Sequence, residues 1–185
     1  MPAWAWILIT VVAVVAVGSI VWMLSKQRRR EALQERFGPE YERTVRERDS
    51  RRAAESELQH REKRREELDI RPLAPVGTRS LRRRVGGVQA KFVDDPNTAV
   101  LDANGLVLRV MGDRGYPMEE FEQRAADISV DHPDVVENYR AAYRIAVLDG
   151  DGRAGTEDLR QAMVHYRSLF EELLGDETSE SRAAQ

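Results

Sequence analysis

Hydrophobic and charged positions divide the chain into three stretches. The first, residues 3–24, carries no charge and is rich in Val, Ala, Ile and Trp. The second, to about residue 70, is dense in Arg and Glu around a short apolar stripe. The third repeats apolar residues at helical spacing, with Gly and Pro between the repeats. No segment alternates apolar and polar residues with the period of a strand, so the pattern predicts an all-α chain.

The uncharged N-terminal run predicts a transmembrane helix as an anchor over residues 1–25. An apolar run of about 18 residues is long enough to cross a bilayer, and Trp favours both membrane interfaces. Positive charge directly after the run predicts a single-pass protein of the cell membrane, with its N-terminus outside and its C-terminal domain cytoplasmic. The residues expected to form this anchor are Trp4, Trp6, Trp22, Lys26, Arg28, Arg29 and Arg30.

A cleavable signal peptide is the alternative interpretation of the same run. Ala16, Val17 and Gly18 resemble a small-residue cleavage site. No Lys or Arg precedes the apolar residues, whereas signal peptides begin with a basic region, so we favour the uncleaved anchor. A cleaved signal or the opposite insertion would instead make the chain an envelope or secreted-side structural protein.

Residues 26–69 predict a charged helical stalk. Gly38-Pro39 and Asp49-Ser50 are expected to interrupt it, because Pro suits the first turn of a new helix and Asp or Ser can cap one. The helical pieces predicted in this way are 26–37, 39–48 and 50–68. The apolar stripe consists of Leu33, Phe37, Tyr41 and Val45. Two Pro and a Gly then predict a linker over residues 70–79.

Residues 80–174 predict a small bundle of four to five helices, followed by a disordered tail over residues 175–185. Asp95-Pro96 is expected to start one helix and Gly115 to end it, while Gly175 is expected to end the last. Gly86-Gly87 weakens the first helix, which we place at 80–93. Core packing is expected for Tyr139, Tyr143, Tyr166 and Phe170.

Charge is distributed unevenly along the chain. Residues 26–91 hold 20 Lys and Arg against 12 Asp and Glu, a net +8, whereas residues 92–185 hold 9 against 20, a net −11. The basic segment is expected to meet anionic membrane lipid, and the acidic bundle to present the surface for a protein partner. Nucleic-acid binding is not expected, because it requires a basic folded domain. The chain has no Cys and therefore no disulfide or thiolate metal site.

Four sequence motifs can be compared with known proteins: RFGPEY at 36–41, RGYP at 114–117, FEQRAAD at 121–127 and SVDHPDVVENYR at 129–140. They resemble stretches of uncharacterised single-span or short helical proteins from actinobacteria. The resemblance covers most of residues 30–174 and implies a bacterial, helical protein. It brings no activity, cofactor or partner with it.

The segment 149–159 resembles part of an EF-hand calcium loop. Asp149, Asp151 and Asp158 occupy ligand positions, but Val147 stands where the first carboxylate is required. An Asp- and Gly-rich loop between helices, with Thr156 as helix cap, explains the same residues. We therefore expect no metal and no cofactor.

No catalytic residues are indicated, because no nucleophile or base has an orienting partner in the sequence. The chain has three His, namely His60, His132 and His165, and nothing predicts that any two converge. The chain is therefore expected to act by protein–protein interaction or scaffolding, as a membrane-tethered domain facing the cytoplasm. An enzyme built around His132 or His165 is a distant third hypothesis.

Overall fold

A computed structural model describes residues 3–150 and 153–183, and it describes side chains for residues 16–74, 77–147 and 153–175. The described residues form helices and connecting loops without a strand, which confirms the all-α class. The helices are α1 Ala3–Glu47, α2 Arg51–Glu67, α3 Pro75–Lys91, α4 Pro96–Arg114, α5 Phe121–Asp131, α6 Val136–Gly150 and α7 Thr156–Ala183. They fall into two compact units, Met1–Leu58 and Gln59–Gln185, with the division inside α2.

The first unit contains α1 and the start of α2. Gly38 interrupts α1 with φ 44° and ψ −124°, and Pro39 follows in the next helical piece. Ser50 Oγ accepts the Ala53 N–H at 3.2 Å and caps α2. Both predicted breaks are therefore confirmed. Among the side chains described in this unit, the buried apolar ones are Leu33, Phe37, Tyr41, Ala54 and Leu58.

The prediction of a transmembrane anchor at residues 1–25 is wrong. No helix in the described part of the chain has the length and apolar character needed to cross a bilayer. The single-pass membrane location and the orientation drawn from it are withdrawn with the anchor.

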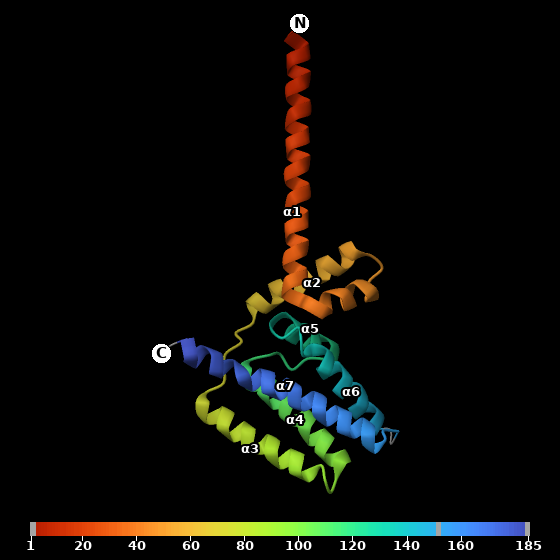
Figure 1. Cartoon of the computed structure of the whole chain (residues 1–185), viewed down its shortest axis with the longest axis vertical. Helices are drawn as coiled ribbons and strands as arrows, with labels where there is room; N and C mark the ends of the chain where they lie inside the picture. The colour runs from red at the N-terminus through yellow and green to blue at the C-terminus, as the bar shows by residue number, and fades with distance from the viewer. Residues whose placement is uncertain (1–2, 151–152, 184–185) are drawn as a thin grey trace. The chain divides into compact units, whose positions relative to one another are not determined.

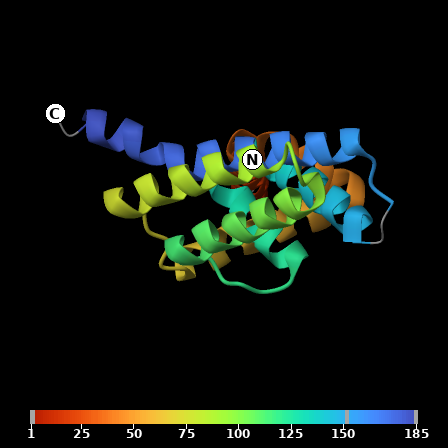
Figure 2. The same ribbon diagram turned by 90° about the horizontal axis from the view of Figure 1, so that it is seen from below.

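The second unit is a helical bundle built around α4 and α7. Helix α7 lies against α6, α4 and α3, and α4 also packs on α3 and α6, while α5 packs on α6 (Figure 1). Figure 2 shows α3, α4 and α7 running alongside one another. The most deeply buried side chains include Val107, Val110, Ile128, Tyr139 and Tyr166. This packing leaves one face of the α3–α4 pair without a covering helix of the same unit.

Two local signals in the bundle act as the sequence predicted. Asp95 accepts the Thr98 N–H at 3.1 Å and Pro96 occupies the first turn of α4. Gly115 ends α4 in the left-handed region, at φ 94°. A Cβ at Gly115 would lie 2.4 Å from the Asp69 carbonyl oxygen, so both the conformation and the close approach require glycine.

Two helices are longer than the sequence indicated. Helix α3 begins at Pro75, within the stretch we predicted as a linker, and continues without a break through Gly86 and Gly87. Helix α7 continues through Gly175 to Ala183, where we had expected a stop and a disordered tail. Glycine lowers helix stability by about 1 kcal/mol but does not remove a backbone hydrogen bond, so flanking residues can carry a helix through it.

Candidate ligand groove between α3 and α4

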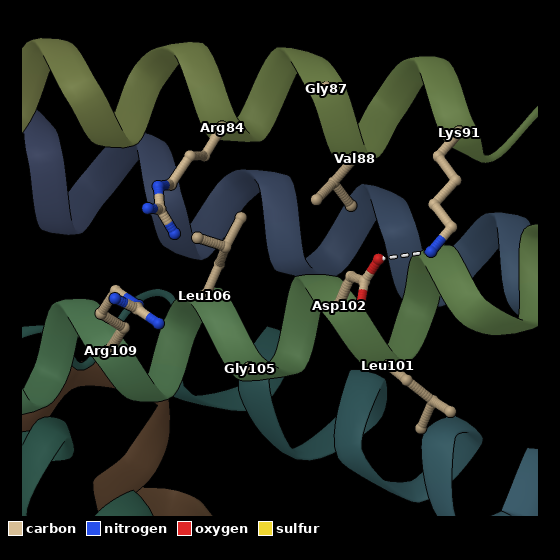
Figure 3. Close-up of a pocket in the computed structure, with 9 residues that line it drawn as sticks. All are labelled: Arg84, Gly87, Val88, Lys91, Leu101, Asp102, Gly105, Leu106 and Arg109. Carbon is tan, nitrogen blue, oxygen red and sulfur yellow. Dashed lines mark hydrogen bonds and ion pairs between the residues drawn. The ribbon is translucent and has the colours of Figure 1, made fainter.

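A groove of about 440 Å³ lies between α3 and α4. Four lining residues come from α3 at spacings of three, one and three, which is one helix face: Arg84, Gly87, Val88 and Lys91. Five come from one face of α4: Leu101, Asp102, Gly105, Leu106 and Arg109. Consecutive helices pair in opposite directions here, so Arg84 lies near Arg109 and Lys91 lies near Asp102 (Figure 3).

The two ends of the groove differ in charge. At one end Lys91 Nζ lies 2.8 Å from Asp102 Oδ2, with the two side chains 40% and 45% exposed. At the other end Arg84 and Arg109 are both exposed, and Figure 3 shows their guanidinium groups directed into the same gap. Among the residues with described side chains, neither arginine has a carboxylate partner. The groove therefore presents two arginines available to an anion and one neutralised lysine.

The middle of the groove is apolar and carries little side-chain bulk. Leu106 is 7% exposed and Val88 packs against the core, so these side chains form the floor. Leu101 is 53% exposed at the rim. At both Gly87 and Gly105 an added Cβ would meet nothing within 4 Å. A ligand can therefore lie on apolar side chains between the two glycines while it reaches the arginines.

The basic residues predicted to flank a membrane anchor lie on α1. Trp22 is 68% exposed, and Lys26 Nζ lies 5.5 Å from the centre of its ring, within cation–π range. Arg28 and Arg29 are exposed and Arg30 is half-buried. The side chains of Trp4 and Trp6 lie outside the described residues. This region belongs to the first unit and contributes nothing to the α3–α4 groove.

The predicted EF-hand-like loop is only partly described. Asp151 and the side chain of Asp149 lie outside the described residues. Asp158 Oδ2 accepts the Gly155 N–H at 2.9 Å, the half of a capping box expected at the third position of α7. Hydrogen bonds from Arg160 and Gln161 lower the pKa of Glu157 to about 2. Among the described residues no group of three or more His, Cys, Asp or Glu could hold a metal ion.

The three histidines occupy separate environments. His60 is exposed on α2. His132 is 4% exposed, and its Nδ1 lies 3.2 Å from Glu172 Oε1. His165 Nδ1 lies 3.0 Å from Asn138 Oδ1, and burial together with the charge of Arg144 lowers its pKa. Glu172 follows His165 by seven residues on α7, about 10 Å along the helix, so these two imidazole contacts lie apart.

Three of the four aromatic residues predicted for the core pack there, and Tyr143 is only half-buried. Tyr139, Tyr166 and Phe170 are buried, and the half-buried Tyr143 stacks on Phe121 with ring centres 3.7 Å apart. Burial raises the pKa of Tyr166, whose hydroxyl donates to Asn104 Oδ1 at 3.1 Å. These side chains hold the bundle together and leave no exposed aromatic groove among them.

A second polar cluster joins the end of α2 to α5. Arg64 Nε donates to Asp127 Oδ1 at 2.9 Å, and Arg64 Nη2 lies 2.8 Å from Glu119. Asp131 accepts from Arg65 and from the Tyr116 hydroxyl, which lies at 2.9 Å. Burial, and after it the charge of Asp131, raises the pKa of Tyr116. The charged groups of this cluster are paired with one another, so its role is to fix the bundle.

Sequence reasoning missed the α3–α4 groove. The available signals were Arg84 within the basic run before Gly86-Gly87, and those two glycines inside an otherwise helical segment. Comparison of the chain with protein-family models, curated proteins and solved structures found no match.

Proposed function

We propose that this chain is a protein-interaction domain whose α3–α4 groove binds an acidic segment of a partner protein. The observation that supports this is the pair Arg84 and Arg109. They enter one groove from facing helices, and neither has a carboxylate partner among the described residues. Several other arginines of the bundle are paired with carboxylates, as Arg64 is with Asp127. Each guanidinium group presents a planar fork of N–H donors that matches the two oxygens of a carboxylate.

The rest of the groove favours a protein segment over a small anion or a nucleic acid. Leu101 is half-exposed at the rim and Val88 lies in the floor, so an occupant meets apolar side chains next to the arginines. A small anion would leave that apolar surface uncovered. A nucleic acid would face the net charge of −11 of residues 92–185. An acidic peptide with aliphatic residues complements both parts of the site.

The test is a binding titration with the full chain. The probe is a labelled synthetic peptide with two Glu one helical turn apart beside Leu, followed by fluorescence anisotropy. Arg84→Gln/Arg109→Gln is expected to weaken binding by roughly tenfold or more, since a hydrogen bond to a charged group contributes about 1.5–3 kcal/mol. The matched control is Arg79→Gln/Arg83→Gln, which removes the same charge from α3 outside the groove.

Three outcomes would overturn the proposal. One is failure of the wild-type chain to bind the acidic peptide better than the same peptide with Lys in place of Glu. Another is equal weakening by the control pair, which would indicate attraction to charge without a site. The third is tighter binding of duplex DNA than of the acidic peptide at physiological salt.

A further inference from the structure

We propose that the occupant of the groove is an amphipathic α-helix of the partner, packed over Gly87 and Gly105 with its acidic residues at Arg84 and Arg109. This inference rests on the proposed function and adds the conformation and register of the bound segment. It arises from three observations: the helical walls of the groove, the two glycines at its centre, and the difference in charge between its two ends.

The walls of the groove have the geometry that accepts a helix. Lys91 follows Arg84 by seven positions on α3, a rise of about 10 Å or two helical turns. Both walls are regular helix over the whole of this length. A third helix packs on such a pair by placing a ridge of its side chains into the groove between them. Helix-in-groove recognition uses this arrangement, with anchors at spacings of three and four residues.

The two glycines provide the closest approach at the centre. Glycine inside a helix is less stable than alanine, and neither position needs it for the fold. Both lie in regular helix, and a Cβ at either would meet nothing within 4 Å. What sets these two glycines apart from the equally open Gly86 is that both line the groove. They let a partner backbone come nearer to α3 and α4 than the usual 8–10 Å between helix axes.

The charges set the register of the bound helix. Lys91 is neutralised by Asp102, whereas Arg84 and Arg109 have no carboxylate partner among the described residues. An acidic pair on the partner helix therefore lies at the arginine end. Its aliphatic residues one turn further along lie over Val88 and Leu106, and the remainder passes beside Leu101 at the rim.

The experiment compares Gly87→Ala and Gly105→Ala with Gly86→Ala in the full chain. Gly86 is the matched control, because it lies next to Gly87 in α3, is equally open, and does not line the groove. All three variants are expected to raise Tm by about 2–4 °C, since alanine favours the helix. Affinity for the acidic probe is expected to fall about fivefold or more in Gly87→Ala and Gly105→Ala only, because the methyl groups overfill the packed centre.

The second arm varies the probe. A peptide of the same composition with Pro at its centre cannot form a continuous helix and is expected to bind at least about tenfold more weakly. Equal affinities of all three glycine variants, or equal binding of the two peptides, would overturn the helix proposal while the acidic peptide still binds wild type. If wild type fails to bind the acidic peptide, it is the proposed function that fails.

Discussion

Lys91 and Asp102 close one end of the α3–α4 groove as an ion pair, with Nζ 2.8 Å from Oδ2. The pair removes one positive charge from a groove that would otherwise present three. It also leaves Arg84 and Arg109 as the cations available to a ligand. Both side chains are about half-exposed, so substitution of either residue changes the charge of the groove with little effect on the stability of the fold.

Asp102→Asn is expected to strengthen binding of the acidic peptide, because it frees Lys91 while keeping the shape of the groove. An exposed pair is worth about 0.2–1 kcal/mol, so the expected gain is about two- to fivefold in affinity. Lys91→Gln is the opposite control, since it leaves Asp102 facing the ligand and should weaken binding. Anisotropy titrations at low and physiological salt measure both. Weaker binding by Asp102→Asn would contradict the assignment of charge in the groove.

Gly115→Ala is expected to destabilise the fold by about 2 kcal/mol or more. The substitution places a side chain at φ 94°, and its Cβ would lie 2.4 Å from the Asp69 carbonyl oxygen. Gly112→Ala is the matched control in the same helix, since its Cβ would make an ordinary 3.7 Å contact with Met118. Urea unfolding of the two variants should give opposite signs. Equal stability would show that residues 69 and 115 do not meet closely.

Asp127→Ala is expected to lower the free energy of unfolding by about 3 kcal/mol, because two donors lose the buried carboxylate that accepts their hydrogen bonds. Asp127 is 2% exposed and accepts from Arg64 at 2.9 Å and from Gln123 at 2.9 Å. Glu119→Ala removes the other partner of Arg64, but Glu119 is 53% exposed. That variant should cost less than about 1 kcal/mol in the same urea measurement. Similar losses for the two would refute the role given to Asp127.

The stability of the fold is expected to decrease at pH values below about 6.5, the ordinary pKa of histidine, in part through His165. Burial lowers the pKa of His165 in the folded state, so the folded chain binds this proton less well than the unfolded chain. The contribution of His165 is therefore present above that pH and is lost as the pH falls through the folded-state pKa. Thermal unfolding between pH 7.5 and 5.5 should show a smaller decrease for His165→Gln than for wild type. An equal decrease would exclude His165 as a source.

The sequence predicts the local features of the fold well, because single residues carry them. Asp95 with Pro96 starts a helix, and Gly115 ends one, through interactions that reach only a few residues. Gly86 and Gly87 are a case in which the local signal gives the wrong expectation. Their low helix propensity predicts a weak helix, yet α3 runs through them because its apolar face packs on the bundle.

The groove could not be predicted in the same way, because it depends on which residues of two helices meet. The chain between Arg84 and Arg109 contains the end of α3, a turn and most of α4, so their proximity follows only from the pairing of the two helices. The apolar residues before Lys26 were the strongest single pattern in the sequence and gave the anchor prediction that the structure contradicts. The sequence led us to expect the partner surface on the acidic bundle in general, whereas we now propose one basic groove.

Charge reversal at Arg84 and Arg109 tests whether these two residues form the binding site for an acidic segment. The full chain carrying Arg84→Glu/Arg109→Glu is titrated with the acidic helical peptide and with its Lys counterpart, beside wild type and Arg79→Glu/Arg83→Glu. The account predicts that the groove variant loses the acidic peptide and gains the basic one, while the control pair keeps the wild-type preference. Retention of the acidic peptide by the groove variant, or the same inversion in the control, would contradict it.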